Sequence, residues 1–115
     1  MLQKIFIPLL NNNGEDSEIS LHFGHAPYFG LYSADTKELI IKENKLDHND
    51  ARKSPVEQII ESANPDIVFA RDIGQRAMML FQEKNIKLKT GRCKTVKELI
   101  ENVESLEDLK SGCGH

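Results

Sequence analysis

The sequence predicts an α/β domain with a mixed five-stranded sheet flanked by helices. Three strand-like segments precede the first helical pattern, and a four-residue turn joins two of them, which indicates antiparallel pairing. Two further short apolar segments alternate with helical patterns, as parallel strands joined by right-handed crossovers do. The predicted order is therefore β-β-β-α-β-α-β-α, with the first strand in the middle of the sheet and helices on both faces.

The first predicted strand spans residues 4–10, which are mostly apolar. The Asn-Asn-Asn-Gly run at residues 11–14 has strong turn chemistry and ends this strand. The connection over residues 11–27 is longer than most loops in compact domains. Loops of such length are usually functional or disordered, so this one is a candidate for function.

A hairpin follows the long connection. Residues 28–33 and 39–43 have strand-like composition, and the polar residues 34–37 predict the turn between them. Residues 44–53 are polar and predict a second loop. The hairpin should therefore extend the sheet on one side of the first strand.

The first helix is predicted from its start signals. Ser54 can cap it, Pro55 suits the first helical position, and Glu57 completes a capping box. Asn64 and Pro65 end it. The apolar residues follow at i, i+3, i+4 and i+7, which predicts one buried face: Val56, Ile59, Ile60 and Ala63.

The next two elements are a buried strand and a second helix. Residues 67–70 form a continuous apolar run, the pattern of a strand covered on both faces. Asp72 and Gln75 can open a helix, and Asn85 can cap its end. Residues 86–89 alternate as the fifth strand. The inward face of this helix should comprise Ala77, Met78, Leu80 and Phe81.

The last helix begins at a second capping box, in which Thr95 is paired with Glu98. Residues 105–110 could add one more helical turn. The buried stripe of this helix should be formed by Val96, Leu99, Ile100 and Val103.

The composition is that of a single globular domain. The chain has 115 residues, of which 39% are hydrophobic and 29% charged. We expect one domain at residues 1–110 and a flexible tail at residues 111–115 that contains a cysteine and a histidine. No stretch approaches the roughly 20 apolar residues that a membrane span needs, so we expect a cytoplasmic protein with no membrane partner.

The distribution of charge favours an anionic ligand over nucleic acid. The formal net charge of −3 argues against general nucleic-acid affinity. Residues 84–97 nevertheless contain six basic side chains and no acidic one. A local basic patch can attract an anion whatever the net charge, although such a run is often only solvated surface.

The segment Ile-Ser-Leu-His-Phe-Gly-His-Ala-Pro-Tyr-Phe at residues 19–29 is the most distinctive stretch. It places His22 and His25 around Phe23 and Gly24, and neutral imidazole is the commonest metal ligand in proteins. Gly24 allows the backbone to turn, and Pro27 favours extended structure before it. We therefore predict an exposed, shaped loop that could hold a metal.

This segment resembles the Ser-x-His-Phe-Gly-Arg-Ala-Pro-x-Phe signature of the dinitrogenase iron-molybdenum cofactor biosynthesis family. Asp-Ile-Gly-Gln-Arg-Ala at residues 72–77 is similar to the family's Asn-Ile-Gly-x-x-Ala. His25 replaces the usual arginine and Asp72 the usual asparagine. The resemblance implies a ribonuclease H-like architecture, and it implies binding of an iron-molybdenum cofactor or its iron–sulfur precursor.

The predicted topology brings the candidate residues to one edge of the sheet. In open α/β sheets, ligands bind outside the carboxyl ends of the parallel strands. The long loop, the start of the second helix and the segment after the fifth strand should meet there. Helix N-termini favour anions, and thiolates and imidazoles ligate iron–sulfur clusters. The predicted cofactor-binding residues are His22, Gly24, His25, Ile73, Gly74, Arg92, Cys93 and Lys94, and the predicted metal ligands are His22, Cys93, Cys113 and His115.

Each candidate also has a plain structural interpretation. Paired histidines are often solvated loop residues, and Ile73 with Gly74 could only let the helix pack close to the sheet. Cys93 could be inert, but its basic neighbours should lower its pKa if the thiol is exposed. The tail that contains Cys113 could be a disordered end.

Two functions compete. The first is a carrier that binds an iron-molybdenum cofactor precursor or another iron–sulfur cluster and delivers it to an assembly or acceptor protein. The alternative is a regulatory or adaptor module that senses metal or redox state through its cysteines and histidines. We expect a monomer in either case.

An enzymatic role is not expected. A ribonuclease H-like nuclease needs inward carboxylates to hold magnesium, and residues 4–10 contain none. The Gly-x-x-x-x-Gly-Lys-Ser/Thr motif of P-loop nucleotide hydrolases does not occur. Cys93 and His22 could form a nucleophile–base pair, but no third orienting group is evident.

Overall fold

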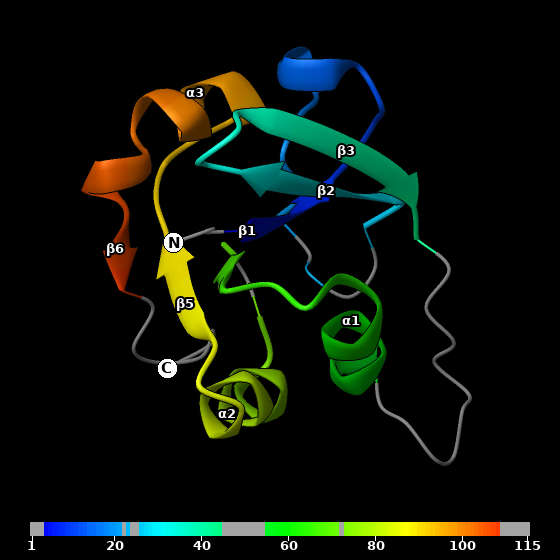
Figure 1. The fold of residues 1–115 in the computed structure, drawn as a ribbon, viewed down its shortest axis with the longest axis vertical. Helices are drawn as coiled ribbons and strands as arrows, with labels where there is room; N and C mark the ends of the chain where they lie inside the picture. The colour runs from blue at the N-terminus through cyan, green and yellow to red at the C-terminus, as the bar shows by residue number, and fades with distance from the viewer. Residues whose placement is uncertain (1–3, 22, 24–25, 45–54, 72, 109–115) are drawn as a thin grey trace.

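Six strands form one mixed sheet with helices on both faces (Figure 1). The computed structural model describes residues 4–21, 23, 26–44, 55–71 and 73–108. The strands are β1 (Lys4–Leu9), β2 (Tyr28–Ser33), β3 (Glu38–Glu43), β4 (Ile67–Phe69), β5 (Lys87–Thr90) and β6 (Glu107–Asp108). The helices are α1 (Pro55–Ala63), α2 (Gln75–Glu83) and α3 (Val96–Glu101), with 3-10 turns η1 (Gly14–Asp16) and η2 (Val103–Ser105).

The strand order is β3-β2-β1-β4-β5-β6, which confirms that β1 lies inside the sheet. β1 is antiparallel to β2, from Lys4 opposite Ser33 to Leu9 opposite Tyr28. It is parallel to β4, and β4 is parallel to β5. The α/β class, the mixed sheet and the crossover arrangement predicted from the sequence are therefore confirmed.

The prediction of five strands was wrong, because β6 adds a sixth. Over residues 105–108, the described part of the helical turn predicted at residues 105–110, the chain instead leaves η2 and becomes an extended segment that pairs antiparallel with β5. Leu106 is partly buried against the core beside α3, and Asp108 forms an ion pair with Lys89 of β5. These two contacts favour extended chain over another turn of helix.

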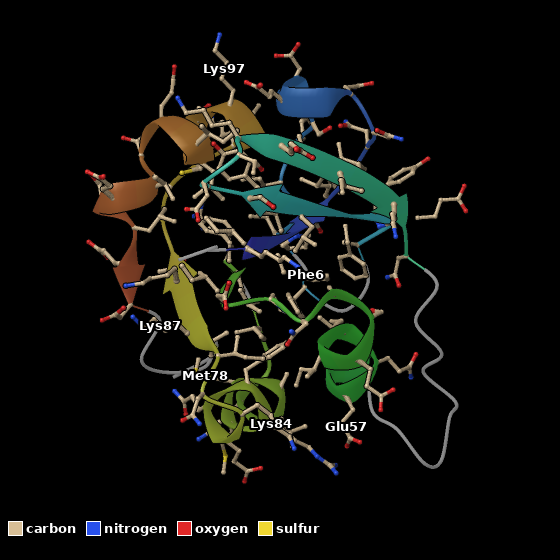
Figure 2. All side chains as sticks on the ribbon, viewed as in Figure 1. Phe6, Glu57, Met78, Lys84, Lys87 and Lys97 are labelled. Atoms are coloured by element: carbon tan, nitrogen blue, oxygen red, sulfur yellow. The ribbon has the colours of Figure 1, made fainter. Side chains whose placement is uncertain are left out.

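Successive side chains of each strand point to opposite faces of the sheet, so the core is divided into two clusters, one on each face. The α1–α2-face cluster includes Phe6, Phe23, Phe29, Ile59, Val68, Ile73, Met78, Phe81 and Leu88. The α3-face cluster includes Ile5, Ile7, Leu9, Ile19, Phe69, Cys93, Val96 and Leu99. Figure 2 shows Phe6 in the space between the sheet and the helices of the first cluster.

The helix ends follow the capping signals in the sequence. The Thr95 hydroxyl accepts a hydrogen bond from the backbone N–H of Glu98 at 3.3 Å, which confirms the predicted cap of α3. Asn64 and Asn85 adopt left-handed conformations, with φ of 45° and 62°, just after α1 and α2. Ser54 and Asp72, the other predicted cap residues, lie outside the described residues. Among the helices described, none is long and apolar enough to cross a membrane.

Candidate functional site

The loop after β1 folds back against the end of that strand. The backbone N–H of Leu10 donates to the carbonyl of Glu18, and the N–H of Ser20 donates to the carbonyl of Pro8, both at 2.8 Å. The Asn11 side chain accepts from the N–H of Glu18 at 3.0 Å. The residues of this loop up to Ser20 are thus an ordered platform at the carboxyl end of β1.

A buried serine supports this platform, and the sequence analysis did not single it out. Ser17 is fully buried, and its hydroxyl accepts a hydrogen bond from the backbone N–H of Asn13 at 2.7 Å. Serine and asparagine side chains commonly bond to nearby backbone in turns. That tendency, applied to the polar run that starts at Asn11, was the signal available in the sequence.

The same loop is joined directly to the connection between β5 and α3. The N–H of Ile19 donates to the carbonyl of Lys94 at 2.8 Å, and the N–H of Val96 donates to the carbonyl of Ser17 at 3.1 Å. The loops that follow β1 and β5 therefore meet at the carboxyl edge of the sheet, as the topology predicted. This part of the edge, from residues 17–20 to residues 93–96, is called the rim below.

Two apolar residues of the distinctive motif are anchors in the core. Phe23 is only 5% exposed, and its ring meets that of Phe81 edge-on with centroids 5.7 Å apart. Ala26 is also buried, whereas Leu21 is 58% exposed. His22, Gly24 and His25 lie outside the described residues. The motif is therefore attached to the α1–α2-face cluster at Phe23 and Ala26, and Leu21 of the same segment lies at the surface.

Two residues precede the first turn of α2: the buried Ile73 and the exposed Gly74. Gly74 forms the N-cap without a side-chain hydrogen bond. A Cβ atom added at Gly74 would meet nothing within 4 Å. Close packing against the sheet therefore does not require this glycine. Its small size instead leaves the positive end of a nine-residue helix accessible.

Cys93 is buried, whereas the lowered pKa considered from the sequence requires an exposed thiol. It is only 6% exposed and packs in the α3-face cluster. Burial raises the pKa of the Cys93 thiol above its ordinary value, the Glu98 carboxylate raises it further, and the Arg71 guanidinium lowers it. The flanking Arg92 and Lys94 are both exposed. A lowered pKa was expected only for an exposed thiol, and that condition is not met, because burial and the Glu98 carboxylate outweigh the Arg71 guanidinium.

A polar hollow adjoins Cys93 on the α3 side. Its volume is about 460 Å³. The thiol lies 3.7 Å from the position that a Cβ at Gly91 would take. The lining residues come from the end of β5 and from the segment between α3 and β6: Gly91, Arg92, Cys93, Asn102, Ser105, Leu106 and Glu107.

The structure brings together the loop that leads to His22 and the loop that contains Cys93. The buried residues of these two loops nevertheless lie in different core clusters. Phe23 belongs to the α1–α2-face cluster and Cys93 to the α3-face cluster, on opposite faces of the sheet. Cys113 and His115 lie outside the described residues. Within the part of the chain that is described, no group of three or more histidine, cysteine, aspartate or glutamate side chains could hold a metal ion.

The basic run at residues 84–97 is not one surface patch. Lys84 and Lys87 lie near the amino end of β5, and Lys97 lies on α3 at the opposite end of the molecule (Figure 2). Lys89 is paired with Asp108. Only Arg92 and Lys94 of this run flank the rim cysteine, so the rim has a smaller cationic surface than the sequence suggested.

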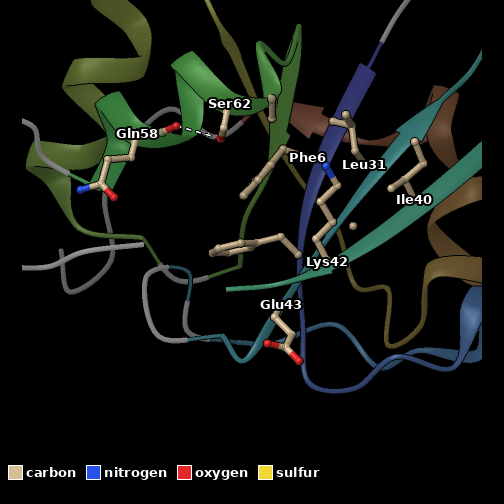
Figure 3. A pocket seen from close by; sticks show the side chains of 10 residues that line it. Phe6, Leu31, Ile40, Lys42, Glu43, Gln58 and Ser62 are labelled. Carbon is tan, nitrogen blue, oxygen red and sulfur yellow. Dashed lines mark hydrogen bonds between the residues drawn. The ribbon is translucent and has the colours of Figure 1, made fainter. Parts of the chain in front are cut away.

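A second hollow was not predicted from the sequence. It has a volume of about 700 Å³ and lies between α1 and the strands β2 and β3 (Figure 3). We call it the β2–β3 groove. The residues that line it are Phe6, Phe29, Gly30, Leu31, Ile40, Lys42, Glu43, Gln58, Ser62 and Ala63.

The family of this chain is identified by its sequence. Residues 3–106 match the family model described as dinitrogenase iron-molybdenum cofactor. The chain belongs to the dinitrogenase iron-molybdenum cofactor family. The match covers both motifs and all of the sheet except β6. No curated protein matches the sequence.

Solved structures with the same fold share little sequence with this family member. A NifB-like protein from Thermotoga has a TM-score of 0.74 at 21% identity, over 97% of this chain and 99% of its own. The apo form of the orange protein from Desulfovibrio gigas has a TM-score of 0.79 at 16% identity, over 96% of each chain. A dinitrogenase-like protein from Methanocaldococcus jannaschii has a TM-score of 0.67 at 18% identity, over 96% of this chain and 98% of its own. At these identities the likeness establishes the fold alone.

Proposed function

We propose that this protein carries an iron-molybdenum cofactor precursor or another anionic iron–sulfur cluster as cargo at the rim and delivers it to an assembly or acceptor protein. The observation that carries the proposal is the backbone bonding of residues 17–19 to residues 94–96. This bonding places the exposed Lys94 beside the loop that continues into the histidine motif. Family membership supports a cluster as the cargo.

Each cofactor-binding residue predicted from the sequence has a proposed role at or beside the rim. His22, which matches the motif histidine, is the principal ligand, since imidazole suits cluster iron. Gly24 and His25 shape the loop around the cargo. Arg92 and Lys94 attract its negative charge. The start of α2 at Ile73 and Gly74 adds the positive end of a helix.

Cysteine ligation takes a secondary place in the proposal. The thiol of Cys93 is buried and has a raised pKa, so it must lose its proton and reach the surface before it can bind iron. The tail residues Cys113 and His115 are proposed to act in transfer. Burial of Cys93 also argues against the alternative function of a fast redox sensor, because a sensing thiol needs access to its oxidant.

The proposed role requires no catalysed reaction, so we propose a non-enzymatic protein of the cytoplasm. The strand order β3-β2-β1-β4-β5, in which only β2 of these five strands runs antiparallel to the others, supports the proposal of a ribonuclease H-like architecture. That architecture would place the rim where open α/β sheets bind ligands.

The test is anaerobic reconstitution with iron and sulfide, followed by metal analysis and visible spectroscopy. We expect the wild-type protein to bind a cluster and His22→Ala to lose most of it. His48→Ala, in the polar loop predicted at residues 44–53, is the control and should bind normally. Removal of residues 112–115 should slow transfer to an acceptor more than it lowers binding. A wild-type protein that binds no cluster, or a His22→Ala variant that loads fully, would contradict the proposal.

A further inference from the structure

The edge strand β3 has a surface suited to a partner. In the part of the chain that is described, β3 ends the sheet, and β2 is its neighbour (Figure 1). The side chain of Ile40, near its middle, is 51% exposed. Edge strands offer backbone N–H and C=O groups to other chains, and natural proteins usually protect them. An exposed isoleucine at the centre of such a strand needs an explanation.

The exposed isoleucine is continuous with the β2–β3 groove. Leu31, Ile40 and Lys42 line this groove from β2 and β3, on the side of the sheet that carries α1 (Figure 3). Leu39 and Ile41 pack on the other side, against the α3-face cluster. Both faces of β3 therefore present apolar side chains close to the sheet edge.

Symmetry limits how two copies of β3 could pair. In a sheet extended across a two-fold axis perpendicular to it, each face of one copy continues the same face of the other. Residues directly opposite each other point to the same face. The register must therefore be centred on one residue, which lies opposite its own copy across the axis, and not between two residues. The central choices are Leu39, Ile40 and Ile41.

Charge decides among these three registers. An axis at Ile40 places Glu38 opposite Lys42 twice. It also places Lys37 opposite Glu43 twice. An axis at Leu39 places Glu38 opposite Ile40, and an axis at Ile41 places Ile40 opposite Lys42. Opposite charges across strands stabilise pairing, so the register centred on Ile40 is the one favoured.

We propose that β3 pairs antiparallel with β3 of a second copy about a two-fold axis at Ile40. The two Ile40 side chains meet at the axis, and each Leu39 lies opposite an Ile41 on the other face. The groove of each copy then continues across the interface. A single strand pair buries little surface, so the dimer should be weak and depend on protein concentration. This proposal does not depend on the cargo, and it replaces the expectation of a monomer.

Charge reversal tests both the dimer and its register. Lys42→Glu places a carboxylate opposite Glu38 of the other copy, and the symmetry repeats this contact. The repulsion should weaken association about tenfold or more. Glu38→Lys does the same with two ammonium groups. The double variant Glu38→Lys with Lys42→Glu restores the complementary pairs and should associate like the wild type. The two single variants, when mixed, should form a heterodimer.

The measurement is sedimentation equilibrium over a concentration series, with circular dichroism to confirm that each variant is folded. Lys97→Glu is the matched control, because it makes the same change in charge at an exposed site on α3. It should leave association unchanged. A wild-type protein that stays monomeric at the highest concentration reached would overturn the proposal. Failure of the double variant or of the mixture to associate would overturn it too, as would equal effects of Lys42→Glu and Lys97→Glu.

Discussion

The ring of Phe23 meets the ring of Phe81 edge-on, at an interplanar angle of 89°. Phe23 comes from the histidine motif and Phe81 from α2, so this contact fastens the motif to the helix whose N-terminus we propose as part of the cargo site. The ring centroid of Phe6 in β1 lies 5.8 Å from that of Phe23, on the same face of the sheet. The motif phenylalanine is thus a structural residue that positions its neighbours.

We therefore expect Phe23→Ala to destabilise the protein by about 3–5 kcal/mol, the usual cost of removing a buried aromatic ring. Leu21→Ala, two residues away at a 58% exposed position, should change stability by only about 0.5 kcal/mol or less. Urea unfolding followed by circular dichroism measures both. Similar losses for the two variants would show that Phe23 does not anchor the motif.

The reactivity of Cys93 should depend on pH through its two charged neighbours. In a Cys113→Ser background, we expect a thiol reagent to modify Cys93 slowly at neutral pH and faster as the pH rises, because burial raises its pKa. Glu98→Gln should move the rate profile to lower pH, and Arg71→Met should move it to higher pH. Shifts in the reverse directions would contradict this assignment of charges.

The same thiol should affect stability in alkaline solution. Folding raises the pKa of Cys93, so the folded state favours the protonated thiol. This contribution to stability is complete below the pKa of the unfolded state and is lost as the pH rises through the pKa of the folded state. Cys93→Ala should therefore flatten the decline in stability on the alkaline side. Chemical denaturation at a series of pH values would measure it, and parallel curves for wild type and variant would contradict it.

Cluster binding should depend on the cations at the rim and not on the whole basic run. Arg92→Glu with Lys94→Glu should weaken binding, and added salt should weaken the wild type, because salt screens exposed charges. Lys84→Glu with Lys87→Glu changes the net charge equally at the amino end of β5 and should have a much smaller effect. Equal effects of the two double variants would point to net charge instead of a localised site. The measurement is the iron content after anaerobic reconstitution.

The cap of α3 gives a prediction for stability. Thr95→Ala removes the hydroxyl that accepts from the N–H of Glu98 and should cost about 1 kcal/mol, whereas Thr95→Ser keeps the acceptor and should cost less. Thermal unfolding distinguishes the two. If the alanine and serine variants lose the same stability, the hydroxyl bond is not the cause.

The sequence predicted the elements whose signals are local and periodic. The hairpin of β2 and β3, the helix starts at Pro55 and Thr95, and the interior position of β1 were all predicted correctly. β6 was missed because a two-residue strand has no periodicity, and its position depends on Leu106 and on the ion pair of Asp108.

The candidate site was predicted less well, because burial depends on distant residues. Charged neighbours on both sides of Cys93 suggested an exposed thiol, yet its side chain points into a core built by β1, β4 and α3. Topology did predict that the loops after β1 and β5 meet, since parallel strands end at the same edge of the sheet. It could not predict the buried Ser17, which depends on how the loop folds back.

The bonds from Ile19 to Lys94 and from Ser17 to Val96 also bear on biosynthesis. They connect a segment near the start of the chain to one near its end, and contacts so far apart in sequence form late in folding. During synthesis on the ribosome, the rim cannot be completed until β5 and the start of α3 have emerged. A truncated chain, although it contains the whole histidine motif, would lack the bonds between residues 17–19 and residues 94–96. On the proposed function, a nascent or damaged protein would therefore be unable to capture a scarce metal cluster before it could pass the cluster on.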